Sequence, residues 1–136
     1  MKKKIVVPKE KEELYYELKQ ADKNIKKIQK HIETLDEQFS ELETVKEALN
    51  EFENTKEGTE IKVPLSSGIY ATASITNSSK LLVNVGANVV VEKKPDEILK
   101  MLEIQQEEVK SHRAAMMVKF HELVHVIEEL QEKITE

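Results

Sequence analysis

The sequence predicts an α+β fold: a long antiparallel coiled-coil hairpin whose two helices are joined by two β-hairpins. All three glycines and all three prolines lie outside residues 9–57 and 96–136, and these two stretches are rich in helix-favouring Glu, Lys, Leu and Gln. Residues 59–93 are instead rich in Val, Ile, Thr, Ser and Asn, and the spacing of apolar residues changes there to two. We therefore expect one domain over residues 1–136, with helices at 9–57 and 96–135 and two hairpins at 59–93.

The first helical stretch carries a heptad seam, because its apolar residues recur at alternating spacings of four and three. They are Leu14, Leu18, Ala21, Ile25, Ile28, Ile32, Leu35, Phe39 and Leu42. The next apolar residue is Val45, again three residues on, followed by Leu49 and Phe52. This irregular step resembles a stammer and predicts a local overwinding of the coil.

The last stretch opens with Pro95, Asp96 and Glu97, which suit a helix N-terminus. Its seam positions are Leu99, Leu102, Gln106, Val109, Arg113, Met116, Phe120, Leu123, Ile127, Leu130 and Ile134. We interpret the two polar members, Gln106 and Arg113, as residues that set the register or face water. At about 1.5 Å per residue the two seams are about 58 and 54 Å long, so they match in length and can pair antiparallel.

The middle of the chain alternates apolar and polar residues and predicts four short strands separated by turn residues. The alternating residues are Ile61, Val63, Leu65, Ile69, Ala71, Ala73, Ile75, Leu81, Val83, Val85, Val89 and Val91. Pro64 cannot donate to a ladder, so its strand should lie at an edge or turn that position outward. About 35 residues of hairpin cannot bury a core of their own. We therefore expect these residues to complete a sheet or barrel with other chains, which predicts an oligomer.

Composition excludes several classes of protein. The chain has no cysteine, so disulfides, thiol catalysis and cysteine zinc sites are ruled out. Its net charge of -5 argues against a nucleic-acid or anionic-membrane binder. No apolar run is long enough for a membrane span, and the apolar run after Lys4 is too short for a secretory signal. We expect a soluble, cytoplasmic protein.

The order helix, two hairpins, helix resembles the alpha class of prefoldin subunits, cytosolic co-chaperones of archaea and eukaryotes. Residues 63–70 (Val-Pro-Leu-Ser-Ser-Gly-Ile-Tyr) are similar to the family's first hairpin, and residues 83–93 to its second. Ser66 and Asn88 stand where the family more often has glycine.

The resemblance implies a hexamer of two alpha and four beta subunits, in which the hairpins form a double β-barrel platform and the coils project from it. It also implies that non-native chains are held between the coil tips and delivered to a group II chaperonin, without ATP. The sequence agrees with this last point, because it has no phosphate-binding glycine-rich loop. No cofactor, metal, nucleic-acid or membrane partner is expected.

The end of the coil that carries both termini is the expected client-binding tip. With Leu99 at position a, Met117 and Val124 fall at e and Val126 at g, so the apolar stripe widens toward the C-terminus. Such a surface suits exposed apolar segments of a client. The alternative is that these residues only pack the coil ends. The expected client-binding set is Ile5, Val6, Val7, Leu14, Tyr15, Leu18, Met117, Val124, Val126, Ile127, Leu130 and Ile134, with Tyr16 beside it.

Residues 121–125, His-Glu-Leu-Val-His, match the H-E-x-x-H zinc motif. In the heptad, His121 and His125 fall on the outer face, and no further histidine follows them as a third ligand. We therefore expect no catalytic residue and no enzyme activity. His31 and His112 are interpreted as single surface residues. The function that competes with a client-holding subunit is a coiled-coil scaffold or assembly adaptor.

Overall fold

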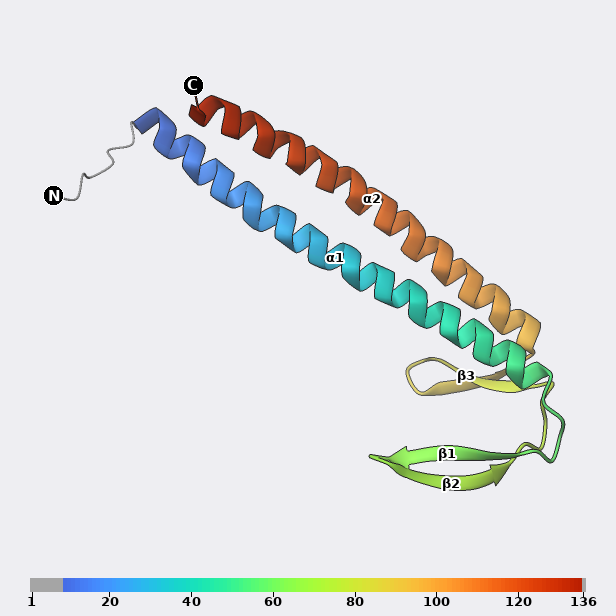
Figure 1. The fold of residues 1–136 in the computed structure, drawn as a ribbon. Helices are drawn as coiled ribbons and strands as arrows, with labels where there is room; N and C mark the ends of the chain where they lie inside the picture. The colour runs from blue at the N-terminus through green and yellow to red at the C-terminus, as the bar shows by residue number, and fades with distance from the viewer. Residues whose placement is uncertain (1–8, 136) are drawn as a thin grey trace. The chain divides into compact units, whose positions relative to one another are not determined.

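The computed structural model describes residues 9–135, which contain two helices and four strands (Figure 1). In chain order they are α1 (Lys9–Glu53), β1 (Glu60–Ser66), β2 (Ile69–Ser74), β3 (Leu81–Gly86), β4 (Val89–Lys93) and α2 (Pro95–Thr135). The predicted α+β class, with two long helices joined by two antiparallel hairpins, is confirmed. The chain divides into two compact units, here called the coil unit (residues up to 39 and from 108) and the hairpin unit (40–107).

In the coil unit, α1 and α2 pair antiparallel along the predicted seams. The Lys11 Nζ donates to the Ile134 carbonyl at 3.0 Å, and the Arg113 Nε donates to the Asp36 carboxylate at 2.6 Å. The polar seam position Arg113 is thus satisfied by a partner on the other helix. Among the described residues of this unit, the buried apolar side chains are all seam residues, namely Ala21, Leu35, Met116 and Leu130.

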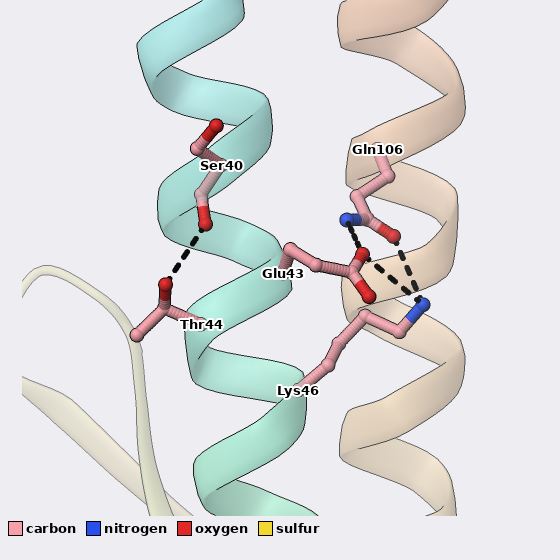
Figure 2. A network of polar contacts seen from close by, with 5 residues as sticks. All are labelled: Ser40, Glu43, Thr44, Lys46 and Gln106. Carbon is pink, nitrogen blue, oxygen red and sulfur yellow. Dashed lines mark hydrogen bonds and ion pairs between the residues drawn. The ribbon is translucent and has the colours of Figure 1, made fainter.

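In the hairpin unit the heptad of α1 continues through a lysine, so the stammer predicted at Val45 is wrong. Val45 is 47% exposed, whereas the Lys46 side chain is 23% exposed and lies beside Gln106 of α2 (Figure 2). The Lys46 Nζ donates to the Gln106 Oε1 at 3.1 Å, and the Gln106 Nε2 donates to the Glu43 carboxylate at 2.7 Å. A lysine is accommodated at this position because the residue facing it is also polar and supplies an acceptor.

Substituting Lys46 with alanine is expected to lower the free energy of unfolding by about 1–2 kcal/mol, because the buried Gln106 carbonyl loses this donor. Denaturant unfolding followed by circular dichroism measures the change. The matched control is Lys26→Ala on the same helix. Lys26 forms an exposed i,i+4 ion pair with Asp22, so its loss should cost at most about 0.5 kcal/mol. Equal costs for the two variants would contradict a stabilising role of the Lys46–Gln106 contact.

Helix α1 ends at Glu53, earlier than the expected residue 57. The Asn54 Nδ2 and the Thr55 Oγ1 donate to the backbone carbonyls of Asn50 and Glu51, at 3.1 and 2.8 Å. These side chains satisfy carbonyls that a continuing helix would have bonded. Helix α2 begins at Pro95, one residue before its expected start, with Asp96 and Glu97 in its first turn.

The strands form two separate two-stranded antiparallel sheets, β1–β2 and β3–β4. Each strand is therefore an edge in this chain, which accommodates Pro64 opposite Tyr70. Both hairpins carry a register shift just before the turn. The second turn has Ala87 and Asn88 at φ 49° and 61°, and asparagine tolerates this left-handed conformation better than most residues that have a Cβ.

Ile75 lies just beyond β2 and closes the base of the first hairpin. Its carbonyl accepts from the Gly58 N–H at 2.7 Å, and its own N–H donates to the Thr59 carbonyl at 3.0 Å. The side chain is 6% exposed. This residue is therefore already packed within the hairpin unit, unlike most of the predicted oligomerisation residues.

Candidate functional site

The coil unit exposes large apolar side chains next to its buried seam. Tyr15 and Tyr16 of α1 are 46% and 65% exposed, and Val118 and Val126 of α2 are 58% and 41% exposed. These residues lie outside the a and d positions that form a two-helix seam, so the pairing of the helices does not require them. They do not form one continuous surface, since Tyr15 and Val126 line different grooves. We call these four residues together the tip patch.

The hollows along this unit include two grooves that are lined by both helices. One, of about 480 Å³, is lined by Tyr15, Leu18, Lys19, Asp22, Ile127 and Gln131. The other, of about 430 Å³, is lined by Asn24, Lys27, Ile28, Lys119, Glu122, Leu123 and Val126. With Leu18 and Leu99 each at position a, the residues that line the first groove fall at a, b and e, and those that line the second fall at c, d and g. The two grooves therefore lie on different flanks of the seam. Each combines apolar side chains with charged ones, which suits chain segments of mixed polarity.

The remaining predicted tip residues divide by burial. Ile5, Val6 and Val7 lie outside the described residues. Leu130 is 6% exposed and belongs to the buried seam. Six others are half-buried at or beside the seam: Leu14, Leu18, Met117, Val124, Ile127 and Ile134.

Sequence reasoning missed Val118 and placed Tyr16 only beside the expected client-binding residues. Val118 occupies position f of the heptad, where a charged residue is usual, so an apolar residue at an outer position was the available signal. Its exposure of 58% shows that it adds to the apolar surface of this unit and not to the seam.

In the hairpin unit, the predicted apolar faces are formed by cross-strand pairs and are largely open. Ile61 lies opposite Ala73 and Val63 opposite Ala71 in the first hairpin, and Val83 lies opposite Val91 in the second. Exposure is highest toward the turns: Leu65 66%, Ile69 58%, Val85 52% and Val89 51%. Ile61 and Val63 are 39% and 36% exposed, while half-buried members are Ala71, Ala73, Leu81, Val83 and Val91.

The opposite faces of the hairpins also expose apolar groups that sequence reasoning left out. Leu82 and Val90 are 72% and 54% exposed, and Tyr70 is 62% exposed. They alternate with residues already assigned to the first face, so a period of two places them on the other side of the sheet. On the second hairpin this face also carries Glu92 opposite Leu82 and Asn84 opposite Val90, so it mixes apolar and polar groups.

The H-E-x-x-H motif lies on an exposed helix face. His121 and His125 are both exposed, and the His125 Nε2 lies 3.1 Å from the Glu129 carboxylate. Within residues 9–135, no three His, Asp or Glu side chains lie where they could jointly hold a metal ion. No helix in this part of the chain is long and apolar enough to cross a membrane.

The two other histidines are not single residues. The ring of His31 on α1 lies with its centroid 4.8 Å from that of His112 on α2, in an edge-to-face arrangement with the planes at 88°. Their 81-residue separation in sequence hid this contact.

Comparisons with known proteins agree on one family. The family model described as Prefoldin subunit matches residues 21–136. The chain is 37% identical over 79 residues to prefoldin subunit alpha of Thermofilum pendens, covering 58% of this chain and 61% of that protein, and thus less than two thirds of that relative's length. It is 23% identical over 122 residues to prefoldin subunit alpha of Methanococcus aeolicus, covering 90% and 83% of the two chains.

A solved structure supports the fold independently. It is the cryo-EM structure of filamentous PFD from Methanocaldococcus jannaschii, with a TM-score of 0.78 and 23% identity, covering 87% of this chain and 98% of that chain. At that identity the likeness establishes the arrangement of helices and hairpins. The resemblance to alpha-class subunits drawn from the sequence is confirmed by the named relatives. Because the family match extends over residues 21–136 of 136, this chain belongs to the prefoldin family.

Proposed function

We propose that this chain is an ATP-independent holdase subunit that captures non-native polypeptides at the tip patch and passes them to a group II chaperonin. Membership of the prefoldin family, a non-enzymatic chaperone family, supports a chaperone co-factor role. The 136 residues act as one prefoldin-like domain in the cytoplasm, without cofactor, nucleic acid or membrane.

The observation that carries this proposal is the exposure of the tip patch, whose side chains the seam does not bury. Leu35 and Met116 of the seam are 4% and 9% exposed, while Tyr16 and Val118 keep more than half of their surface in water. Exposed apolar groups that no packing in the chain requires are typical of an interaction surface. Half-buried Met117 adds an adaptable side chain next to this patch.

The strength of this patch favours capture by several subunits together. Covering a half-exposed Tyr or Val contributes about 1 kcal/mol, so the four residues supply about 4 kcal/mol. This corresponds to a dissociation constant of about 1 mM. Several coils that contact one client raise the affinity by avidity, since each later contact is intramolecular. A holdase with these residues therefore needs an oligomer.

The hairpins supply that oligomer in our proposal. Their open apolar faces and unpaired edges complete a β-barrel platform with prefoldin beta subunits, two alpha with four beta. The residues expected to contact the partner chains are those of the apolar face predicted for each hairpin, together with Ile75 at the base of the first hairpin. An isolated two-stranded sheet with an apolar face is marginally stable in water, which supports burial by partner chains.

The test replaces the tip patch in the assembled complex. The variant Tyr15→Gln, Tyr16→Gln, Val118→Gln, Val126→Gln keeps helix propensity while removing apolar surface. We expect it to need at least about tenfold more complex than wild type to suppress aggregation of an unfolded client, because it loses more than about 1.4 kcal/mol. Light scattering at increasing ratios of complex to client measures this.

The matched control replaces exposed apolar residues outside the tip patch with glutamine. Val45→Gln with Ile104→Gln removes two side chains of the hairpin unit that are 47% and 61% exposed. This control should hold clients as wild type does. Should the intact tip variant suppress aggregation as well as the control, the tip patch is not the client site. A wild-type complex that assembles but never suppresses aggregation would indicate the scaffold function instead.

A further inference from the structure

The coil unit places two imidazole rings side by side on different helices. His31 of α1 and His112 of α2 are both exposed, and their ring centroids lie 4.8 Å apart. Neither ring belongs to the seam or the tip patch. Neutral imidazole is a common ligand of divalent transition metals, and two imidazoles held close together form a chelate.

The centroid distance fits joint ligation of one ion. When each ring nitrogen lies about 2.0–2.1 Å from a metal, the metal lies about 3.2 Å from each ring centroid. Centroids are then about 4.5 Å apart at a right-angled ligand geometry and about 5.2 Å apart at a tetrahedral one. The observed 4.8 Å lies between these values. Both side chains are exposed, so their rings can rotate from the edge-to-face arrangement to aim two nitrogens at one point.

Two cationic residues adjoin the histidines in sequence, Lys30 before His31 and Arg113 after His112, and Arg113 is already paired with a carboxylate. Arg113 follows His112 directly, and its Nε lies 2.6 Å from the Asp36 carboxylate. The ion pair compensates the guanidinium charge close to the rings. Because residues 9–135 offer no third His, Asp or Glu in place, the other coordination positions fall to water. This favours ions with high intrinsic affinity for imidazole, in the order Cu²⁺, then Ni²⁺ and Zn²⁺.

We propose that His31 and His112 form an interhelical site for one divalent transition-metal ion, which clamps α1 to α2 in the coil unit. The clamp joins residues 81 positions apart and opposes separation of the two helices within the coil unit. This site is separate from the H-E-x-x-H motif and does not depend on the proposed chaperone function.

The test uses the untagged full-length chain and metal chlorides. Thermal unfolding followed by circular dichroism should show a midpoint raised by about 5–10 °C at a Cu²⁺ or Ni²⁺ concentration about 100 times the dissociation constant. Calorimetric titration should give one ion per chain at this site. His31→Gln and His112→Gln should each weaken binding by about 100-fold, since the second imidazole binds as an intramolecular ligand. Electron paramagnetic resonance of the Cu²⁺ complex should show two nitrogen donors.

The chain supplies its own control. His121→Gln with His125→Gln removes the other two histidines, which lie one turn apart on the outer face of α2. This variant should keep the metal-dependent rise of the midpoint. A rise lost with His121 and His125 but kept without His31 and His112 would overturn the proposal, as would binding with no effect on the midpoint. Mg²⁺, which prefers oxygen ligands, should have no effect.

Discussion

Replacing Leu35 with alanine is expected to lower the free energy of unfolding by about 3 kcal/mol, the largest effect of any single truncation proposed for this chain. Leu35 is 4% exposed, the lowest value among the buried apolar side chains of the described residues. Those side chains are few and are strung along narrow seams, so a cavity at one of them removes a large share of the core. Urea unfolding followed by helical circular dichroism measures the loss.

The control for this prediction is Val118→Ala, which also truncates an apolar side chain in the coil unit. Val118 is 58% exposed, so its loss creates no cavity and should change stability by at most about 0.5 kcal/mol. A Leu35 variant as stable as the Val118 variant would contradict the antiparallel seam in this unit.

Placing two carboxylates on the open apolar face of the first hairpin is expected to abolish assembly with prefoldin beta subunits. Leu65 and Ile69 are 66% and 58% exposed, so Leu65→Glu with Ile69→Glu leaves the packing of the single chain almost unchanged. In the assembled platform the same groups would be buried charges without partners, which costs about 3–5 kcal/mol for each. Each 1.4 kcal/mol changes an equilibrium constant tenfold, so the association constant for assembly should fall by more than about 100-fold.

Native mass measurement of the variant mixed with a single-hairpin beta subunit tests this prediction, with helical circular dichroism as the check on folding. The matched control is Tyr70→Glu, which alters the opposite face of the same hairpin at 62% exposure. This control should still assemble with the beta subunit as the wild-type chain does. If Tyr70→Glu blocks assembly and the Leu65, Ile69 variant does not, the hairpin uses its other face.

Much of the architecture follows from local patterns. The seam residues that are buried, such as Leu35 and Met116, were predicted from spacings of three and four. The paired apolar faces, such as Val63 with Ala71, were predicted from a spacing of two. These patterns predict the faces correctly because side-chain direction repeats at a fixed period in helices and in strands. The positions of the apolar residues in the sequence therefore show which face of each element is apolar.

The same reasoning fails where a side chain depends on a distant partner. Val45 was assigned to the seam because it is apolar, yet Lys46 takes that direction since Gln106 offers it an acceptor. Ile75 was grouped with the open hairpin face, yet backbone bonds to residues 58 and 59 hold it in a buried position.

The amino-acid order therefore specifies two helices, two hairpins, the seam register up to Leu42 and the family to which the chain belongs, because each depends on periodicity or on contiguous residues. The tertiary structure alone decides that Lys46 lies in the seam and that His31 lies beside His112. Each of these depends on which residue of the second helix lies opposite the first. That pairing is a property of the folded chain, because the spacing of residues within one helix does not determine which residue of the other helix lies opposite.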